Sequence, residues 1–239
     1  MGGCHMAFLF SVLSIVTVFP QDSRSSNYEV HHIGAMRKVM REGDLTGTIE
    51  LQKLARMSHL YALGPLENLR GEVTIWDSTP SISSIEQGKI SISETLNHKA
   101  CFLVYASVKE WKSIPFPETV NDENTFEAWL GKIAAEQGIQ VNRPFPFLIR
   151  DTPGKLQFHI VYKTDDSPHT PAKHEAIKVK FTLEKTACQM LGFHSDSHHG
   201  VFTHHDSNIH MHAITIDKKQ SGHVETVQFS RDAMLLLPR

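Results

Sequence analysis

The chain has 239 residues, enough for one large domain or two small ones around a hydrophobic core. Hydrophobic residues make up 40% of it, charged residues 21%, and the formal net charge is −2 with neutral histidines, as in ordinary globular proteins. Because the sequence has no basic excess and no acidic run, we expect neither a nucleic-acid partner nor a charged tail. Histidine is unusually frequent, with 16 residues, and about half of them lie between His194 and His223.

The N-terminus carries a continuous apolar run, MAFLFSVLSIVTVF, over residues 6–19, followed by the polar stretch QDSRSSN. This run is shorter than the ~20 residues of a membrane-spanning helix, so we expect a signal peptide rather than stable membrane insertion. No Lys or Arg precedes the run, and a buried N-terminal strand is the alternative. We therefore assign residues 1–25 to a signal peptide and expect a secreted or periplasmic protein, with a cytoplasmic location as the alternative.

Residues 26–142 predict an α+β subdomain. Leu51, Leu54 and Leu60 follow helical spacing, so we expect a helix over residues 44–64 that Gly64 ends. A second amphipathic helix is expected over residues 125–138, with a buried stripe of Trp129, Ile133 and Ala134. Strands with period-two alternation are expected at residues 70–78, 89–93 and 99–108.

Residues 143–239 predict a β-rich subdomain with mainly antiparallel pairing, because short apolar runs follow one another with turns between them. The expected strands are residues 144–151, 155–163, 176–184, 186–194, 200–204, 208–217, 223–230 and 233–238.

Three histidines of this second subdomain form a candidate metal site. His210 and His212 are two residues apart on a predicted strand, so their side chains project from the same face. The turn DKKQSG then reverses the chain and brings His223 opposite or diagonal to His212. Three protein ligands with an open fourth position are typical of catalytic Zn²⁺, although imidazole also binds copper, nickel and iron. The alternative is a histidine-rich strand pair without a metal.

The other histidines of this region are expected at the rim of the site. His198, His199, His204 and His205 form two adjacent pairs, whose side chains would diverge on a strand. We therefore place them in loops, where they could assist the site.

Two cysteines remain once Cys4 is assigned to the signal peptide. Cys101 and Cys188 each lie in an apolar, strand-like run. They could form one disulfide in an oxidising compartment, or both could be buried thiols.

Two motifs far apart in the sequence resemble the alpha-acetolactate decarboxylase family. IHMHAITIDKKQSGHV, residues 209–224, resembles that family's HLHF…D…GGHV signature, and HLYALGPLENLRGEVTIWDS, residues 59–78, resembles a second segment that contains a Gly-Glu pair. The order and separation of the motifs also agree. The resemblance implies an α+β fold of mostly antiparallel or mixed β structure, with two β-rich subdomains, a few helices and the metal between the subdomains.

The resemblance also implies an activity and a set of site residues. The expected reaction converts 2-acetolactate to acetoin and carbon dioxide, with His210, His212 and His223 as ligands of Zn²⁺ or another divalent transition metal. Glu72, from the Gly-Glu pair, is then the acidic residue near the metal and the candidate proton donor. We expect a small 2-hydroxy-3-keto acid as substrate and allow for a homodimer.

One departure from the family pattern concerns the substrate. The family carries an arginine in a loop resembling KTRSVPxQ, where a guanidinium group would bind the substrate carboxylate. This chain reads YKTDDSPHTPAKH, which places Asp165 at that position and leaves Lys163 or Lys173 as the nearest cation. A carboxylate there would repel acetolactate. The alternatives are therefore a related lyase or isomerase acting on another hydroxy-keto compound, or a secreted metal-binding homologue without catalysis.

Overall fold

The structure is a computed structural model that describes residues 1–2 and 27–239. The apolar run of the predicted signal peptide, together with Cys4, lies outside the described residues. Within residues 1–2 and 27–239, the helices are too short or too polar to cross a lipid bilayer.

The N-terminal part of the chain forms a six-stranded antiparallel sheet in the order β1-β8-β3-β4-β5-β6. Its central strands β3 and β4 are almost wholly buried, which accounts for their apolar sequences. The strands are β1 (Val30–Ile33), β3 (Leu60–Pro65), β4 (Glu72–Trp76), β5 (Thr79–Glu86), β6 (Lys89–Ser93) and β8 (Leu103–Ser107). A separate two-stranded sheet pairs β2 (Ile49–Glu50) with β7 (Lys99–Ala100).

The rest of the chain forms an eight-stranded antiparallel sheet in the order β12-β11-β15-β14-β13-β10-β16-β9. The strands are β9 (Trp111–Pro115), β10 (Phe145–Asp151), β11 (Lys155–Val161), β12 (Lys178–Glu184), β13 (Cys188–His194), β14 (Ile209–Thr215), β15 (Ser221–Gln228) and β16 (Met234–Pro238). The predicted fold class is therefore confirmed. The subdomain boundary after residue 142 stays a prediction; β9, which precedes it, pairs with β16 in the larger sheet.

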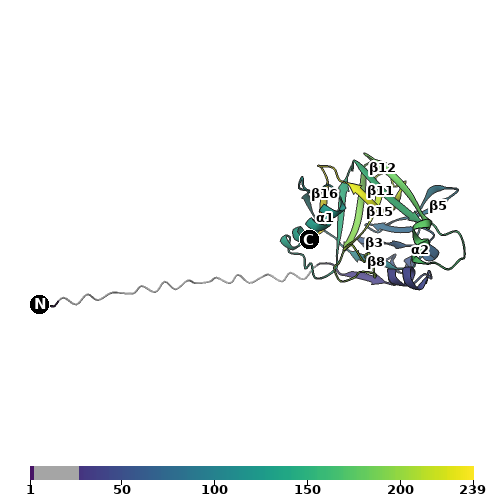
Figure 1. Cartoon of the computed structure of the whole chain (residues 1–239), viewed down its shortest axis with the longest axis horizontal. Coiled ribbons are helices and arrows are strands. Elements are labelled where there is room, and N and C mark those ends of the chain that lie inside the picture. Colours follow the sequence, from purple (N-terminus) through teal and green to yellow (C-terminus); the bar gives the residue numbers. More distant parts are fainter. Residues whose placement is uncertain (3–26) are drawn as a thin grey trace.

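The two sheets contact each other through their central strands. Strand β4 of the smaller sheet contacts β14 and β15 of the larger sheet, and β5 contacts β11. The face of the larger sheet that points away from this contact packs on helix α1 (Glu123–Glu136), as Figure 1 shows. Side chains alternate between the two faces, so Met211 joins the core beneath α1 while His210 and His212 point towards the smaller sheet.

Helix α1 confirms one predicted element and corrects its buried stripe. The Asp122 side chain caps the helix by accepting a hydrogen bond from the Thr125 N–H at 2.8 Å. Phe126 and Leu130 are buried together with Ala134, whereas the predicted Trp129 and Ile133 are only half-buried. The stripe therefore lies one residue position around the helix from the expected one.

The predicted helix over residues 44–64 is wrong. The segment instead contains β2, a 3-10 turn at Leu51–Leu54 and the central strand β3 (Leu60–Pro65). The leucines have helical spacing, but all six residues of β3 are buried between β8 and β4. Hydrogen bonding to two neighbouring strands outweighs a weak local preference for a helix.

The predicted strand over residues 200–204 is also wrong. These residues form turns, and only an isolated bridge between His199 and Thr203 joins them. Gly200 adopts a φ of 69°, which favours a turn over an extended strand. The remaining helical segments are short: a π-helical turn at Lys38–Glu42, 3-10 turns at Glu67–Leu69 and Glu175–Ile177, and α2 (Pro171–His174).

Both remaining cysteines are free, buried thiols, which decides between the two alternatives left open by the sequence. Cys101 packs with Leu63 and Val104 in one core cluster, whereas Cys188 packs with Met190 in another. Burial raises the pKa of each thiol to about 12, so neither is a reactive thiolate near neutral pH.

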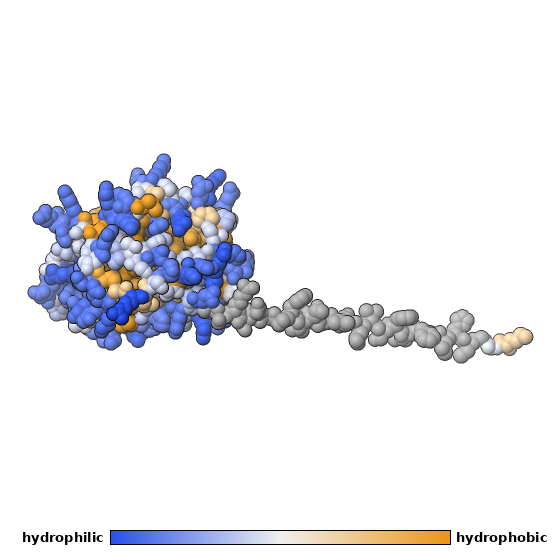
Figure 2. All heavy atoms as spheres, turned by 180° about the vertical axis from the view of Figure 1, so that it is seen from behind, coloured by the Kyte–Doolittle hydropathy of each residue, from blue (hydrophilic) through white to orange (hydrophobic). Residues whose placement is uncertain are grey.

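The surface is mostly hydrophilic, and Figure 2 shows only small hydrophobic patches between the polar groups on the face it presents. Among the described residues, Met1 and Ile216 are the only large hydrophobic residues that are exposed. The homodimer therefore stays a prediction that rests on the sequence.

Candidate active site

The three predicted metal ligands lie together between the two sheets. His210 and His212 project from one face of β14, and the register of β14 and β15 pairs His212 directly with His223. Ligand atoms of the three rings all lie within 4.8 Å of one another, with His210 Nε2 3.0 Å from His223 Nδ1. The strand spacing thus brings these histidines to one point, although their role as ligands stays a proposal.

The neighbours of the three rings favour metal binding. His210 Nδ1 donates a hydrogen bond to the Phe202 carbonyl oxygen at 2.7 Å, which leaves its Nε2 without a proton and free to bind an ion. His212 Nε2 is buried and has no hydrogen-bond partner. A buried nitrogen without a hydrogen-bond partner destabilises the folded protein, and a bound cation would remove this destabilisation. Burial also lowers the pKa of all three histidines, so they are in the neutral form that binds metals.

The His212 ring is oriented by a hydroxyl group from the other sheet. Thr74 on β4 is fully buried, and its Oγ1 lies 2.9 Å from His212 Nδ1. The Ser221 hydroxyl donates in turn to Thr74 Oγ1 at 3.0 Å. If His212 donates its Nδ1 proton to Thr74, its Nε2 is available for a metal, so Thr74 fixes both the ring orientation and the tautomer.

We expect Thr74→Val to lower metal affinity on the order of 10-fold to 100-fold, because valine keeps the shape but accepts no hydrogen bond from His212. Thr74→Ser, which keeps the hydroxyl, should stay within about threefold of the wild-type affinity by this reasoning. The measurement is competition between the protein and a chelator of known affinity. Equal affinities for the valine and serine variants would contradict the assigned role.

Glu72 opens strand β4 directly below this cluster. Its side chain is 3% exposed, its Oε2 lies 3.8 Å from His212 Nε2, and its Oε1 accepts a hydrogen bond from the Val161 N–H at 3.3 Å. The preceding Gly71 has a φ of 148°, and a Cβ there would lie 2.1 Å from the Ser83 carbonyl oxygen. This explains the glycine of the Gly-Glu pair, because only a residue without a Cβ lets the start of β4 pass this close to β5.

Burial raises the pKa of Glu72 from 4.5 to about 8, against the smaller opposing effects of the Val161 N–H and the Lys178 charge. The metal-free folded protein therefore holds a proton that the unfolded chain releases above about pH 4.5. We expect its free energy of unfolding to fall by up to a few kcal/mol as the pH rises through this window to about 8, and Glu72→Gln to flatten that slope. Urea unfolding with a chelator present, repeated across this range, measures the effect.

Sequence reasoning missed His159 on β11. The register of β11 and β15 places it directly opposite His223, so His159, His223 and His212 form a row across three strands. Its Nε2 lies 4.0 Å from Glu72 Oε1, and its Nδ1 lies 2.6 Å from Glu225 Oε1. The available signal was a histidine in the apolar run KLQFHIVYK, but the pairing of β11 with β15 could not be read from it.

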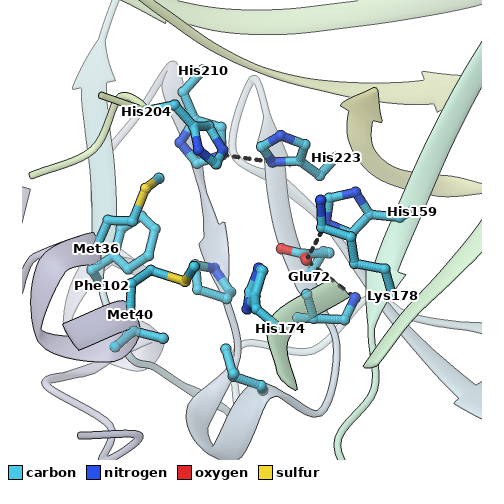
Figure 3. Close-up of a pocket in the computed structure, with 14 residues that line it drawn as sticks. Met36, Met40, Glu72, Phe102, His159, His174, Lys178, His204, His210 and His223 are labelled. Atoms are coloured by element: carbon cyan, nitrogen blue, oxygen red, sulfur yellow. Dashed lines mark hydrogen bonds and ion pairs between the residues drawn. The ribbon is translucent and has the colours of Figure 1, made fainter. Parts of the chain in front are cut away.

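A cavity joins these groups and is shown in Figure 3. Its volume is about 40 Å³, and it is partly open to solvent. Its lining combines seven apolar residues with Glu72, Lys178 and five histidines. The apolar residues are Met36, Val39, Met40, Pro65, Leu69, Phe102 and Val161; the histidines are His159, His174, His204, His210 and His223. Of the predicted rim histidines, His204 alone lines the cavity, whereas His205 is exposed.

The position of Asp165 shows that the expected repulsion of the substrate is wrong. Asp165 does not line the cavity; its side chain is 68% exposed and forms an ion pair with Lys163 at 2.6 Å. This pairing with Lys163, together with a hydrogen bond from Ser167, holds the pKa of Asp165 at about 2. Lys163 is occupied by this pair and Lys173 points to Ser167, so neither of the two predicted cations lines the cavity.

Comparison with known proteins gives a family match and a shared fold. The model of the alpha-acetolactate decarboxylase family matches residues 30–236. The alpha-acetolactate decarboxylase of Bacillus subtilis strain 168 has a TM-score of 0.70 and 15% identity, over 88% of this chain and 85% of that chain. A Staphylococcus aureus protein of unknown function similar to alpha-acetolactate decarboxylase has a TM-score of 0.71 and 16% identity, over 88% and 84%.

No match is found among curated proteins. The low identities mean that the solved structures support the fold alone, whereas the family match covers most of the chain. The predicted enzyme class, a carboxy-lyase that acts on a small molecule, is confirmed at the level of the family. The chain therefore belongs to the alpha-acetolactate decarboxylase family.

Proposed function

We propose that this protein is a metal-dependent decarboxylase that converts 2-acetolactate to acetoin and carbon dioxide. The observation that carries the proposal is the convergence of three neutral imidazoles beside a buried carboxyl group, with His210, His223 and Glu72 lining a cavity between the sheets. The family match supports the same reaction class.

The reaction demands charge stabilisation first. Loss of carbon dioxide from a 2-hydroxy-3-keto acid leaves an electron pair that delocalises onto the ketone oxygen as an enediolate. A divalent metal bound by His210, His212 and His223 would supply the Lewis acidity that this negative charge requires. The hydrogen bonds with Thr74 and the Phe202 carbonyl keep two of the rings in place, which favours such electrostatic stabilisation.

The second demand is a proton for the enediolate carbon. Glu72 borders the cavity beside His212, and its raised pKa means that it holds a proton near neutral pH in the metal-free protein. We assign Glu72 as the acid that delivers this proton from one face of the enediolate, which would give a single enantiomer of acetoin. Bound metal would lower the pKa of Glu72, so its working value is below that of the metal-free protein.

Zinc is the metal we propose. Three histidine ligands with a fourth position open to the cavity are a common arrangement for catalytic zinc. Other divalent transition metals bind imidazole as well, so the ligand set alone gives a preference.

The test combines metal analysis of the purified protein with an acetoin assay on racemic acetolactate. We expect about one zinc per chain, as one three-histidine site implies, and acetoin as the product. Bound metal without acetoin would reject the proposal and favour a related lyase or isomerase, or a homologue that only binds metal. The signal peptide remains part of the proposal, and the N-terminal sequence of the secreted or periplasmic protein tests it.

A further inference from the structure

The cavity contains one strongly basic side chain among the described residues that line it. This is Lys178, the first residue of β12, whose side chain is 14% exposed. Figure 3 shows it beside Glu72 and His159, across the cavity from the apolar Met36 and Met40. A mostly buried ammonium group at the edge of such a cavity is stable only when an anion balances its charge.

The protein supplies this balance from behind the lysine. Lys178 Nζ lies 2.8 Å from Glu225 Oε1 and 3.1 Å from Glu175 Oε2. Lys180 contacts the same two glutamates, so the four side chains form a neutral cluster of two cations and two anions. Of these four residues, Lys178 alone lines the cavity.

The geometry of the ammonium group leaves a binding position open. A lysine ammonium carries three N–H donors, and the two glutamates account for two of them. The remaining donor is available to a ligand in the cavity. The two carboxylates also hold the side chain in place, so a ligand need not order a flexible lysine.

We propose that Lys178 binds the carboxylate of the substrate. This inference rests on the proposed function and names the group that selects an acid over the corresponding neutral ketol. The site would take small 2-hydroxy-3-keto acids: the hydroxyl and ketone oxygens face His210 and His223, the carboxylate faces Lys178, and short alkyl groups lie near Val39 and Met40.

The chemistry predicts which kinetic constant Lys178 controls. The carboxylate charge moves onto the ketone oxygen as the carbon–carbon bond breaks, so the ammonium interacts more strongly with the substrate than with the transition state. Removal of such a contact raises KM and does not lower kcat. The interaction would therefore serve recognition and orientation of the acid.

The test uses Lys178→Met with Lys180→Met as the matched control, because Lys180 contacts the same glutamates but does not line the cavity. Binding of 2,3-dihydroxy-2-methylbutanoate, an unreactive carboxylate analogue, is compared with binding of acetoin, which lacks the carboxylate, in the zinc-supplemented protein. We expect Lys178→Met to weaken binding of the acid by about tenfold to 100-fold and binding of acetoin by less than about twofold. The KM for acetolactate should rise by a similar factor in this variant, and both constants should stay near wild type in Lys180→Met.

Selective loss of the acid in Lys178→Met supports the proposal even if the wild-type protein makes no acetoin, in which case the decarboxylase reaction alone is rejected. Three results would each overturn the proposal. They are equal loss of affinity for the acid and for acetoin, equal effects in the two lysine variants, and unchanged affinity for the acid in Lys178→Met. Zinc content and the melting temperature, measured for both variants, show that the comparison is made between folded, loaded proteins. Lys178→Arg should recover part of the affinity for the acid, because it restores a cation at the same place.

Discussion

Replacing His212 with alanine is expected to remove most of the bound metal and to lower kcat/KM for acetolactate by at least ~10³-fold. The ring is fully buried at the end of the row that runs from His159 through His223, and it is one of the three described residues whose ligand atoms converge on one point. Two histidines would then hold the metal weakly, and the charge left by departing carbon dioxide would lose its main stabilisation. Metal analysis and steady-state kinetics measure the two effects on the same sample.

His205→Ala is the matched control for His212→Ala. His205 belongs to the same histidine-rich region, but its side chain is 85% exposed and lies outside the cavity. Metal content and activity should be unchanged in that variant. Full metal occupancy or wild-type activity in His212→Ala would show that the three histidines are not the metal site.

The convergence of the three histidines could be predicted because it depends on local rules. Residues two apart on a strand share a face, and a short turn fixes the partner strand. These rules placed His210, His212 and His223 correctly with respect to one another. The fold class could be anticipated as well, because turn signals separate most of the strands in the C-terminal half.

What the sequence could not supply was long-range pairing. Thr74 reaches His212 only because β4 of one sheet packs on β14 of the other, and Glu72 was expected near the histidines through the family resemblance alone. His159 enters the site through the pairing of β11 with β15, and Lys178 through the neighbouring strand β12. The helix predicted over residues 44–64 failed for the same reason, since burial between two strands decided its structure.

The position of the substrate-binding cation illustrates a limit of matching by motif. Matched along the chain, Asp165 takes the place of a family arginine and predicts repulsion of the substrate. In the fold, Asp165 turns outwards to Lys163, and the cation at the cavity comes from Lys178, further along the chain. A residue-by-residue comparison cannot detect a charge that is supplied from another strand.

Glu72→Gln is expected to lower kcat by ~10²-fold to 10⁴-fold while the metal stays bound. Glutamine keeps the shape of the side chain and its contact with the Val161 N–H, but it cannot deliver a proton. Water would then protonate the enediolate from either face. The residual acetoin should therefore approach a racemic mixture, which chiral chromatography measures independently of the rate.

The control for Glu72→Gln is Glu86→Gln, which changes an exposed glutamate at the end of β5 in the same sheet. Rate and enantiomeric excess should both match the wild type in that variant. If the Glu72→Gln enzyme is slow but still produces a single enantiomer of acetoin, another group donates the proton and Glu72 has a role in binding. Loss of metal in Glu72→Gln would instead make the carboxylate a ligand, because its Oε2 lies 3.8 Å from His212 Nε2.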